Sequence, residues 1–117
     1  MNILFESAIT ESVREKYILL PLDTFYFQSA DRTEVAYGLI ENTPILEMMA
    51  ADRYTDLHCK LIENYQKQNW SFCENAIEHL TGKWSKEIDS FYSELSTRIA
   101  SLKETTPPGW TSTIHRP

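Results

Sequence analysis

The stretch that decides the fold of the first third of the chain is ILLPLDTFYF, residues 18–27. It is rich in branched and aromatic residues, which favour strands, and Phe25 and Phe27 alternate with Thr24 and Tyr26. Pro21 lacks a backbone donor, so it indicates an edge position or a bend in the early part. The sequence therefore predicts a β-strand over residues 18–27.

A second alternating run follows this strand after a short turn. Val35, Tyr37 and Leu39 alternate with polar or small residues, and four turn residues, 29–32, separate the two runs. This arrangement predicts a β-hairpin. Because a two-stranded hairpin is marginally stable by itself, we expect its edges to be available to a partner strand or to a second copy of the chain.

Helical periodicity marks the segments on both sides of the hairpin. Residues 7–17 predict a short helix, because Ile9 and Val13 fall four apart on one face. After residue 42, apolar side chains recur at helical spacing in three further segments. The stripes are Tyr54, Leu57, Leu61, Ile62 and Tyr65; Trp70, Cys73, Ile77 and Leu80; and Trp84, Ile88, Phe91, Tyr92, Leu95, Ile99 and Leu102. Such helices are not stable alone, so the second and third should pack against the first.

Start and stop signals bound these helices. Thr43 and Pro44 suit the beginning of the first, because threonine caps helices and proline fits the first turn. Ser71 and Glu74 have the spacing of a capping box at the start of the second, and Gly82 is a suitable stop.

The predicted fold class is α+β. A short N-terminal helix and a β-hairpin occupy residues 1–41, and a part of three to four helices occupies residues 42–104. An extended tail occupies residues 105–117, because Pro107-Pro108-Gly109 ends regular structure. We expect the three parts to form one folded unit.

Composition and charge exclude several classes of function. The chain has 117 residues and only three glycines, which are far apart, so a glycine-rich phosphate loop is absent. The net charge of −6 disfavours nucleic acid as a partner. No apolar run is long enough to cross a bilayer, no signal-peptide pattern is visible, and two cysteines make no disulfide framework. We expect a cytoplasmic protein with no membrane partner.

The segment from Ile3 to Leu39 resembles the closing part of a class III adenylate/guanylate cyclase catalytic domain. The coinciding residues are Glu6, Ser7, Val13, Leu22, Asp23, Tyr37 and Leu39. The helical part is similar to the tetratricopeptide-like tail of many bacterial cyclases. It matches through NYQKQNW at residues 64–70, through Cys73 at a position where alanine is usual, and through PPGW at residues 107–110.

This resemblance implies a chain without the cyclase active site. In that family the metal-binding aspartates, the base-selecting residues and the Asn/Arg pair lie upstream of the matching segment. A phosphate-contacting lysine and a glycine would fall where this chain has Gln28 and Ser29. Neutral glutamine cannot supply the cation that a triphosphate needs. We therefore expect no catalytic residues, no cofactor and no metal.

The histidines and cysteines point to structural roles. His58, Cys59, Cys73 and His79 lack the tight spacing of zinc ligands, and the two histidines are expected on helix surfaces. Cys73 could be a nucleophile, but it falls on an apolar stripe, where packing is favoured.

Asp52 and Asp56 would share one helix face, as a catalytic carboxylate pair could. Lys60 lies four residues after Asp56, so an exposed ion pair is the favoured interpretation.

Five aromatic residues are the candidates for binding another protein. Trp70 begins an apolar stripe, which also fits core packing. Trp110 lies outside any stripe, so it either folds back over the helices, as the family resemblance favours, or stays exposed as an anchor. The five candidates are Trp110, Tyr65, Trp70, Tyr37 and Phe25.

Three functions remain open at this point. The first is a non-catalytic protein-interaction module that acts as an adaptor, regulator or inhibitor. The second is an accessory subunit that acts in trans on a nucleotide cyclase. The third is an enzyme of unrecognised type, which no residue pattern supports.

Overall fold

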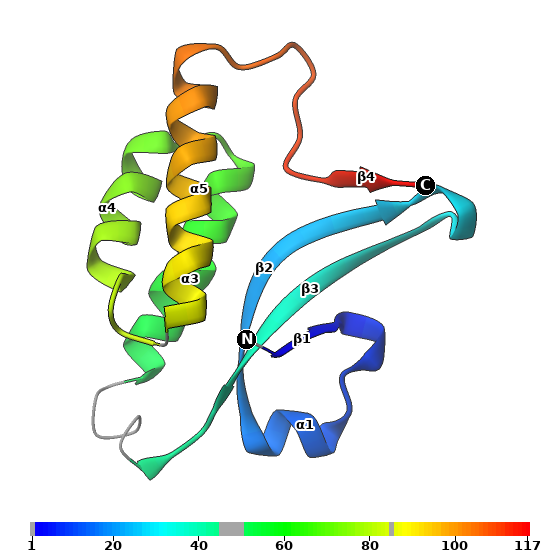
Figure 1. Cartoon of the computed structure of the whole chain (residues 1–117), viewed down its shortest axis with the longest axis vertical. Helices are drawn as coiled ribbons and strands as arrows, with labels where there is room; N and C mark the ends of the chain where they lie inside the picture. Colours follow the sequence, from blue (N-terminus) through cyan, green and yellow to red (C-terminus); the bar gives the residue numbers. More distant parts are fainter. Residues whose placement is uncertain (1, 45–50, 85) are drawn as a thin grey trace.

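The predicted hairpin forms the centre of a four-stranded sheet, and a layer of helices lies along one side of it (Figure 1). The structure, a computed structural model, describes residues 2–44, 51–84 and 86–117. The hairpin strands are β2 (Tyr17–Phe27) and β3 (Arg32–Glu41), joined by the 3-10 turn η2 (Gln28–Ala30). Asp31 follows the turn with a left-handed φ of 46°, and its carboxylate accepts a hydrogen bond of 2.6 Å from the Tyr26 hydroxyl. The α+β class is confirmed.

A bulge interrupts the hairpin where Pro21 predicts a bend. The register shifts between Pro21 and Thr24, so that Leu22 and Asp23 of β2 stand opposite Ala36 of β3. A bulge of this kind sharpens the local twist and re-aims side chains. Leu22 and Asp23 consequently line the same groove, which is described below.

The chain's own strands occupy part of each hairpin edge, so the expectation of open hairpin edges is wrong at Ala36–Leu39 of β3 and at Phe25–Phe27 of β2. β1 (Asn2–Phe5) pairs antiparallel with β3, and β4 (Ile114–Arg116) pairs parallel with Phe25–Phe27 of β2. The strand order is β1-β3-β2-β4. Along these paired positions of the described residues, the outer edges of the sheet belong to β1 and β4.

The N-terminal helix is shorter than the predicted span of 7–17. A 3-10 turn, η1 (Glu6–Ala8), precedes the helix α1 (Glu11–Lys16). Thr10 is the N-cap, and its hydroxyl accepts a hydrogen bond of 3.3 Å from the Val13 amide. The backbone of this capping threonine is extended, so Thr10 lies outside the helix and the helix begins only at Glu11.

The three later helices form, as α3 (Ala51–Gln66), α4 (Trp70–Leu80) and α5 (Lys86–Glu104), but Trp84, predicted on the third helix, lies before the start of α5. Pro44 is helical, whereas the rest of the predicted beginning of the first helix, residues 45–50, lies outside the described residues. The stripes meet in one core that also includes Leu20 and Leu22 of β2. Its fully buried members include Leu61, Cys73, Leu80, Ile88, Tyr92, Leu95 and Ile99.

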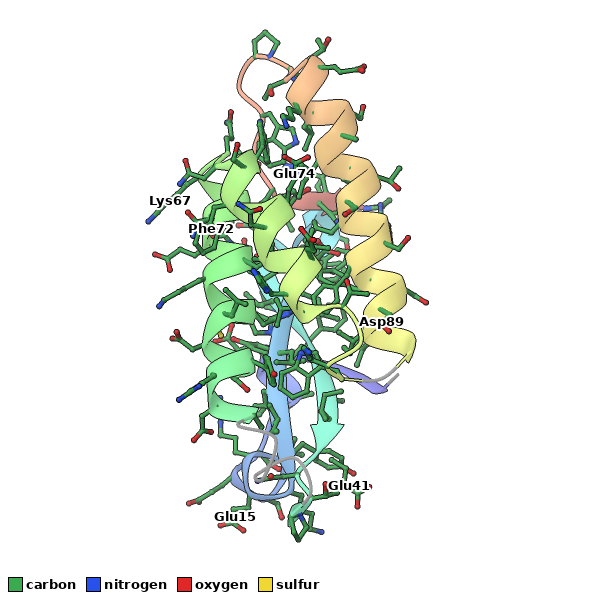
Figure 2. All side chains as sticks on the ribbon, turned by 90° about the vertical axis from the view of Figure 1, so that its left-hand side faces the viewer. Glu15, Glu41, Lys67, Phe72, Glu74 and Asp89 are labelled. Atoms are coloured by element: carbon green, nitrogen blue, oxygen red, sulfur yellow. The ribbon has the colours of Figure 1, made fainter. Side chains whose placement is uncertain are left out.

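The predicted capping box at the start of α4 is wrong. The N-cap is Asn69, whose side chain makes no cap hydrogen bond but donates instead to the Asn64 side chain at 2.8 Å. Ser71 is therefore the second residue of the helix, and Glu74 lies on its surface and binds Lys103 at 2.9 Å (Figure 2). Gly82 ends this region with a φ of 86°, as a glycine stop requires.

Candidate protein-binding site

A groove with a volume of about 430 Å³ lies between the sheet and α5. Its apolar lining comes from all three antiparallel strands and from the first half of α5. Its polar lining comes from the bulge of β2 and from α5. The lining residues are Ile3, Phe5, Leu22, Asp23, Phe25, Ala36, Ser90, Phe91 and Glu94.

The register of the sheet explains why the groove is apolar and hollow. Phe5 of β1 pairs with Ala36 of β3, whose side chain is a single methyl group. The small side chain leaves space on the face that the neighbouring strands line with larger groups. Phe25 packs edge-on against Phe5, with ring centroids 5.8 Å apart. Alternation along each strand places Ile3, Phe5 and Ala36 on the same face.

One arginine, Arg98, joins two carboxylates that line the groove, those of Asp23 and Glu94; these three side chains are called the rim below. The Arg98 guanidinium lies 2.8 Å from an Asp23 oxygen and 2.7 Å from a Glu94 oxygen. Burial alone would lower the pKa of Arg98, but the hydrogen bonds that Arg98 donates to the Asp23 and Glu94 carboxylates raise it, so the guanidinium stays charged. The three side chains together carry one net negative charge.

Two large hydrophobic side chains are exposed in the described part of the chain, Ile3 at 50% and Phe72 at 38%. Ile3 belongs to β1 and lines the groove. Phe72 belongs to α4 and lies on the helical side of the molecule, which faces the viewer in Figure 2. The exposed apolar surface of β1 is thus continuous with the groove, whereas Phe72 is not among the residues that line it.

Three of the five candidate aromatic residues come together in one cluster. Trp110 folds back and packs edge-on against Tyr65 and Trp70, with centroid distances of 5.5 and 5.6 Å. Tyr65 is buried, and burial raises the pKa of its hydroxyl. Through these ring contacts, Trp110 packs the segment after α5 against α3 and α4.

The other two candidates lie elsewhere on the sheet. Phe25 lines the groove. Tyr37 follows Ala36 on β3, so it points to the opposite face, where it is half-buried and where burial raises the pKa of its hydroxyl. The structure therefore places one of the five candidates in the groove, and Tyr37 belongs neither to the groove nor to the aromatic cluster.

The expectation that His58 lies on a helix surface is wrong. His58 is fully buried between α3, β2 and α5. Its Nε2 lies against the carbonyl oxygen of Pro21, which can only accept, so Nε2 carries the hydrogen. Nδ1 then accepts from the Tyr92 hydroxyl at 2.9 Å. Burial lowers the pKa of His58 to about 4, so this histidine is a neutral structural connection and not a surface group.

The remaining candidates are dispersed. No group of three or more histidine, cysteine or acidic side chains within the described ranges is placed to hold a metal ion. Asp56 pairs with Lys60 at 2.9 Å, which confirms the predicted ion pair. Gln28 and Ser29 are exposed at the hairpin turn.

Cys73 is buried, and burial raises the pKa of its thiol to about 11, whereas Cys59 is exposed. Burial and the nearby Asp56 carboxylate also raise the pKa of the Cys59 thiol, so accessibility is what separates the two cysteines. A thiol reagent at pH 8 should therefore modify the exposed Cys59 in the folded chain and Cys73 only after unfolding. Mass spectrometry of the labelled chain, with and without urea, measures this. Cys59→Ser should then show almost no labelling in the folded state, and rapid labelling of that variant would contradict the buried position.

The rim residues were not found by sequence reasoning. Arg98 and Glu94 were readable as a helical pair at a spacing of four, but Asp23 lies 75 residues from Arg98. Only the packing of α5 on the bulge brings these groups together.

No family model, curated protein or solved structure matches the chain. None of the described helices is long and apolar enough to cross a membrane.

Proposed function

We propose that the chain is a non-catalytic protein–protein interaction module, acting as an adaptor, regulator or inhibitor of a larger cytoplasmic protein. The observation that carries the proposal is the groove between the sheet and α5. It is open, it is lined mainly by apolar side chains, and it continues into the half-exposed Ile3. Exposed apolar surface that adjoins a cavity is typical of binding sites.

The helical part supports the same proposal. α3 and α4 are joined by a short connection, and α5 packs beside α4, as a tetratricopeptide-like unit would require (Figure 1). We include this likeness in the proposal, because stacked helix pairs of that kind present surfaces to other proteins.

Complex formation with purified components tests the proposal. Proteins captured from the native cell extract by the tagged chain are identified, produced separately, and mixed with the untagged chain, and native mass spectrometry then measures the stoichiometry. We expect a complex of defined stoichiometry. A chain that stays monomeric with every purified candidate would overturn the proposal.

A second candidate function is an accessory subunit that acts in trans on a nucleotide cyclase. The observation that favours it is the order of elements. β1, α1 and the β2–β3 hairpin precede the helices, and Trp110 folds back on them. This is the order that the cyclase resemblance implies. Addition of the purified chain to a class III cyclase from the same cells should change cyclic-nucleotide output; unchanged output together with no binding would exclude this role.

A further inference from the structure

We propose that the groove between the sheet and α5 takes a segment of another protein in which large apolar side chains stand next to a lysine or arginine. This inference rests on the proposed interaction function and names the chemistry of the partner. It concerns the floor formed by Ile3, Phe5, Phe25 and Phe91 and the rim formed by Asp23, Arg98 and Glu94.

The floor requires an apolar occupant. About 430 Å³ is within the size range of ordinary ligand sites, and it can accept more than one large side chain. Ile3 is half-exposed, so an occupant that covers it removes apolar surface from water, which favours association.

The net negative charge of the rim favours a cation. One guanidinium, that of Arg98, is shared by two carboxylates, so one negative charge is left without a counterion within the group. The Glu94 side chain is 63% exposed, which leaves it accessible to an incoming lysine or arginine. A hydrogen bond between charged groups at such a rim fixes orientation and gives specificity.

The same charges argue against a second copy of the chain as the occupant. The chain has a net charge of −6, and two copies would repel each other. An acidic segment would meet Glu94 with like charge. A basic apolar segment satisfies both the floor and the rim.

Selection from a displayed library of random 16-residue peptides tests the proposal. We expect the enriched peptides to contain a cluster of Leu, Ile, Phe or Trp with Lys or Arg within a few positions. The dissociation constants of the enriched peptides, synthesised with a fluorescent label, are then measured at low and high salt. Binding should weaken as salt increases, since the rim contact is partly exposed.

Two variants and one control locate the site. Ile3→Asp places a charge on the apolar floor and should weaken binding about tenfold or more. Glu94→Gln removes the exposed negative charge and should weaken binding of the basic peptides about threefold, while peptides with Lys and Arg replaced by Gln should bind both forms equally. Phe72→Asp changes the other exposed hydrophobic side chain, on α4, and should leave binding unchanged.

The outcomes separate this inference from the proposed function. Enriched peptides that bind Ile3→Asp as well as the original chain, or that lack basic residues, overturn the inference, and so does a failure to enrich any peptide. In these cases a complex of the original chain with a purified partner still upholds the interaction function. Thermal unfolding of each variant checks that a loss of binding is not a loss of folding.

Discussion

Replacement of Leu20 by alanine should lower the free energy of unfolding by about 2–5 kcal/mol, because it opens a cavity where the sheet meets the helices. Leu20 lies on β2, has no exposed surface, and packs in the core that α3, α4 and α5 share. Loss of a buried leucine removes both its transfer free energy and the contacts of its neighbours. Urea denaturation followed by circular dichroism measures the change.

Leu19 provides a matched control for this substitution. It is the same residue type on the same strand, but it points to the other face of the sheet, where it is only partly buried. Leu19→Ala should therefore cost about 1 kcal/mol or less. Equal losses at both positions would mean that the helical layer is not the main core of the molecule.

The second large effect is expected at His58. Replacement by alanine removes the ring that connects Pro21 of β2 to Tyr92 of α5, and it leaves the buried Tyr92 hydroxyl without this partner. An unsatisfied buried hydroxyl costs about 1–3 kcal/mol, and the cavity adds to it, so we expect a total loss of about 2–4 kcal/mol. The free energy of unfolding at pH 7.5 measures it.

His58 should also make the protein sensitive to mild acid. Its pKa is about 4 in the folded state and about 6.5 in an unfolded chain, so the unfolded state binds the proton more tightly. The contribution of the neutral His58 to the free energy of unfolding is therefore fully present above about pH 6.5. It falls by about 1.4 kcal/mol per pH unit as the pH drops toward 4. Denaturation midpoints at pH 7 and pH 5 give the difference, which should be about 2 kcal/mol.

A glutamine at position 58 separates the titration from the structural role. His58→Gln keeps an amide donor near Pro21 but cannot take up a proton, so its stability should change little between pH 7 and pH 5. A variant that loses as much stability as the original chain over this range would show that other groups cause the acid sensitivity.

Local patterns account for the part of the fold that the sequence predicts. The alternation in residues 18–39 and the helical stripes depend on neighbours close in sequence, and both are confirmed as β2, β3, α3, α4 and α5. β4 was not predicted as a strand, since it has only three residues and pairs with Phe25–Phe27, far away in the chain. The predicted capping box is wrong because the helix already begins at Trp70, so that Asn69 and not Ser71 occupies the N-cap position.

The candidate site was less predictable, since it depends on long-range packing. The aromatic ring of Phe25 makes it a candidate for protein binding from the sequence, and Phe25 lines the groove. Ile3, Asp23 and Glu94 also line the groove, but no pattern in the neighbouring sequence marks them as binding residues. His58 looked like a surface residue because nothing near it in sequence reveals the Pro21 carbonyl or the Tyr92 hydroxyl. A buried polar group is recognisable only together with its partners.

The position of β4 has a consequence for how the protein folds during synthesis. The hairpin can form once residues 17–41 have left the ribosome, but the β2 edge at Phe25–Phe27 stays uncovered until residues 114–116 have been added. The hydrogen bond from the Ser29 hydroxyl to the Pro117 carbonyl joins positions 88 residues apart. While residues 42–113 are being synthesised, the nascent chain therefore exposes an unpaired strand edge, and this is the interval in which it is most prone to aggregate and to need a chaperone.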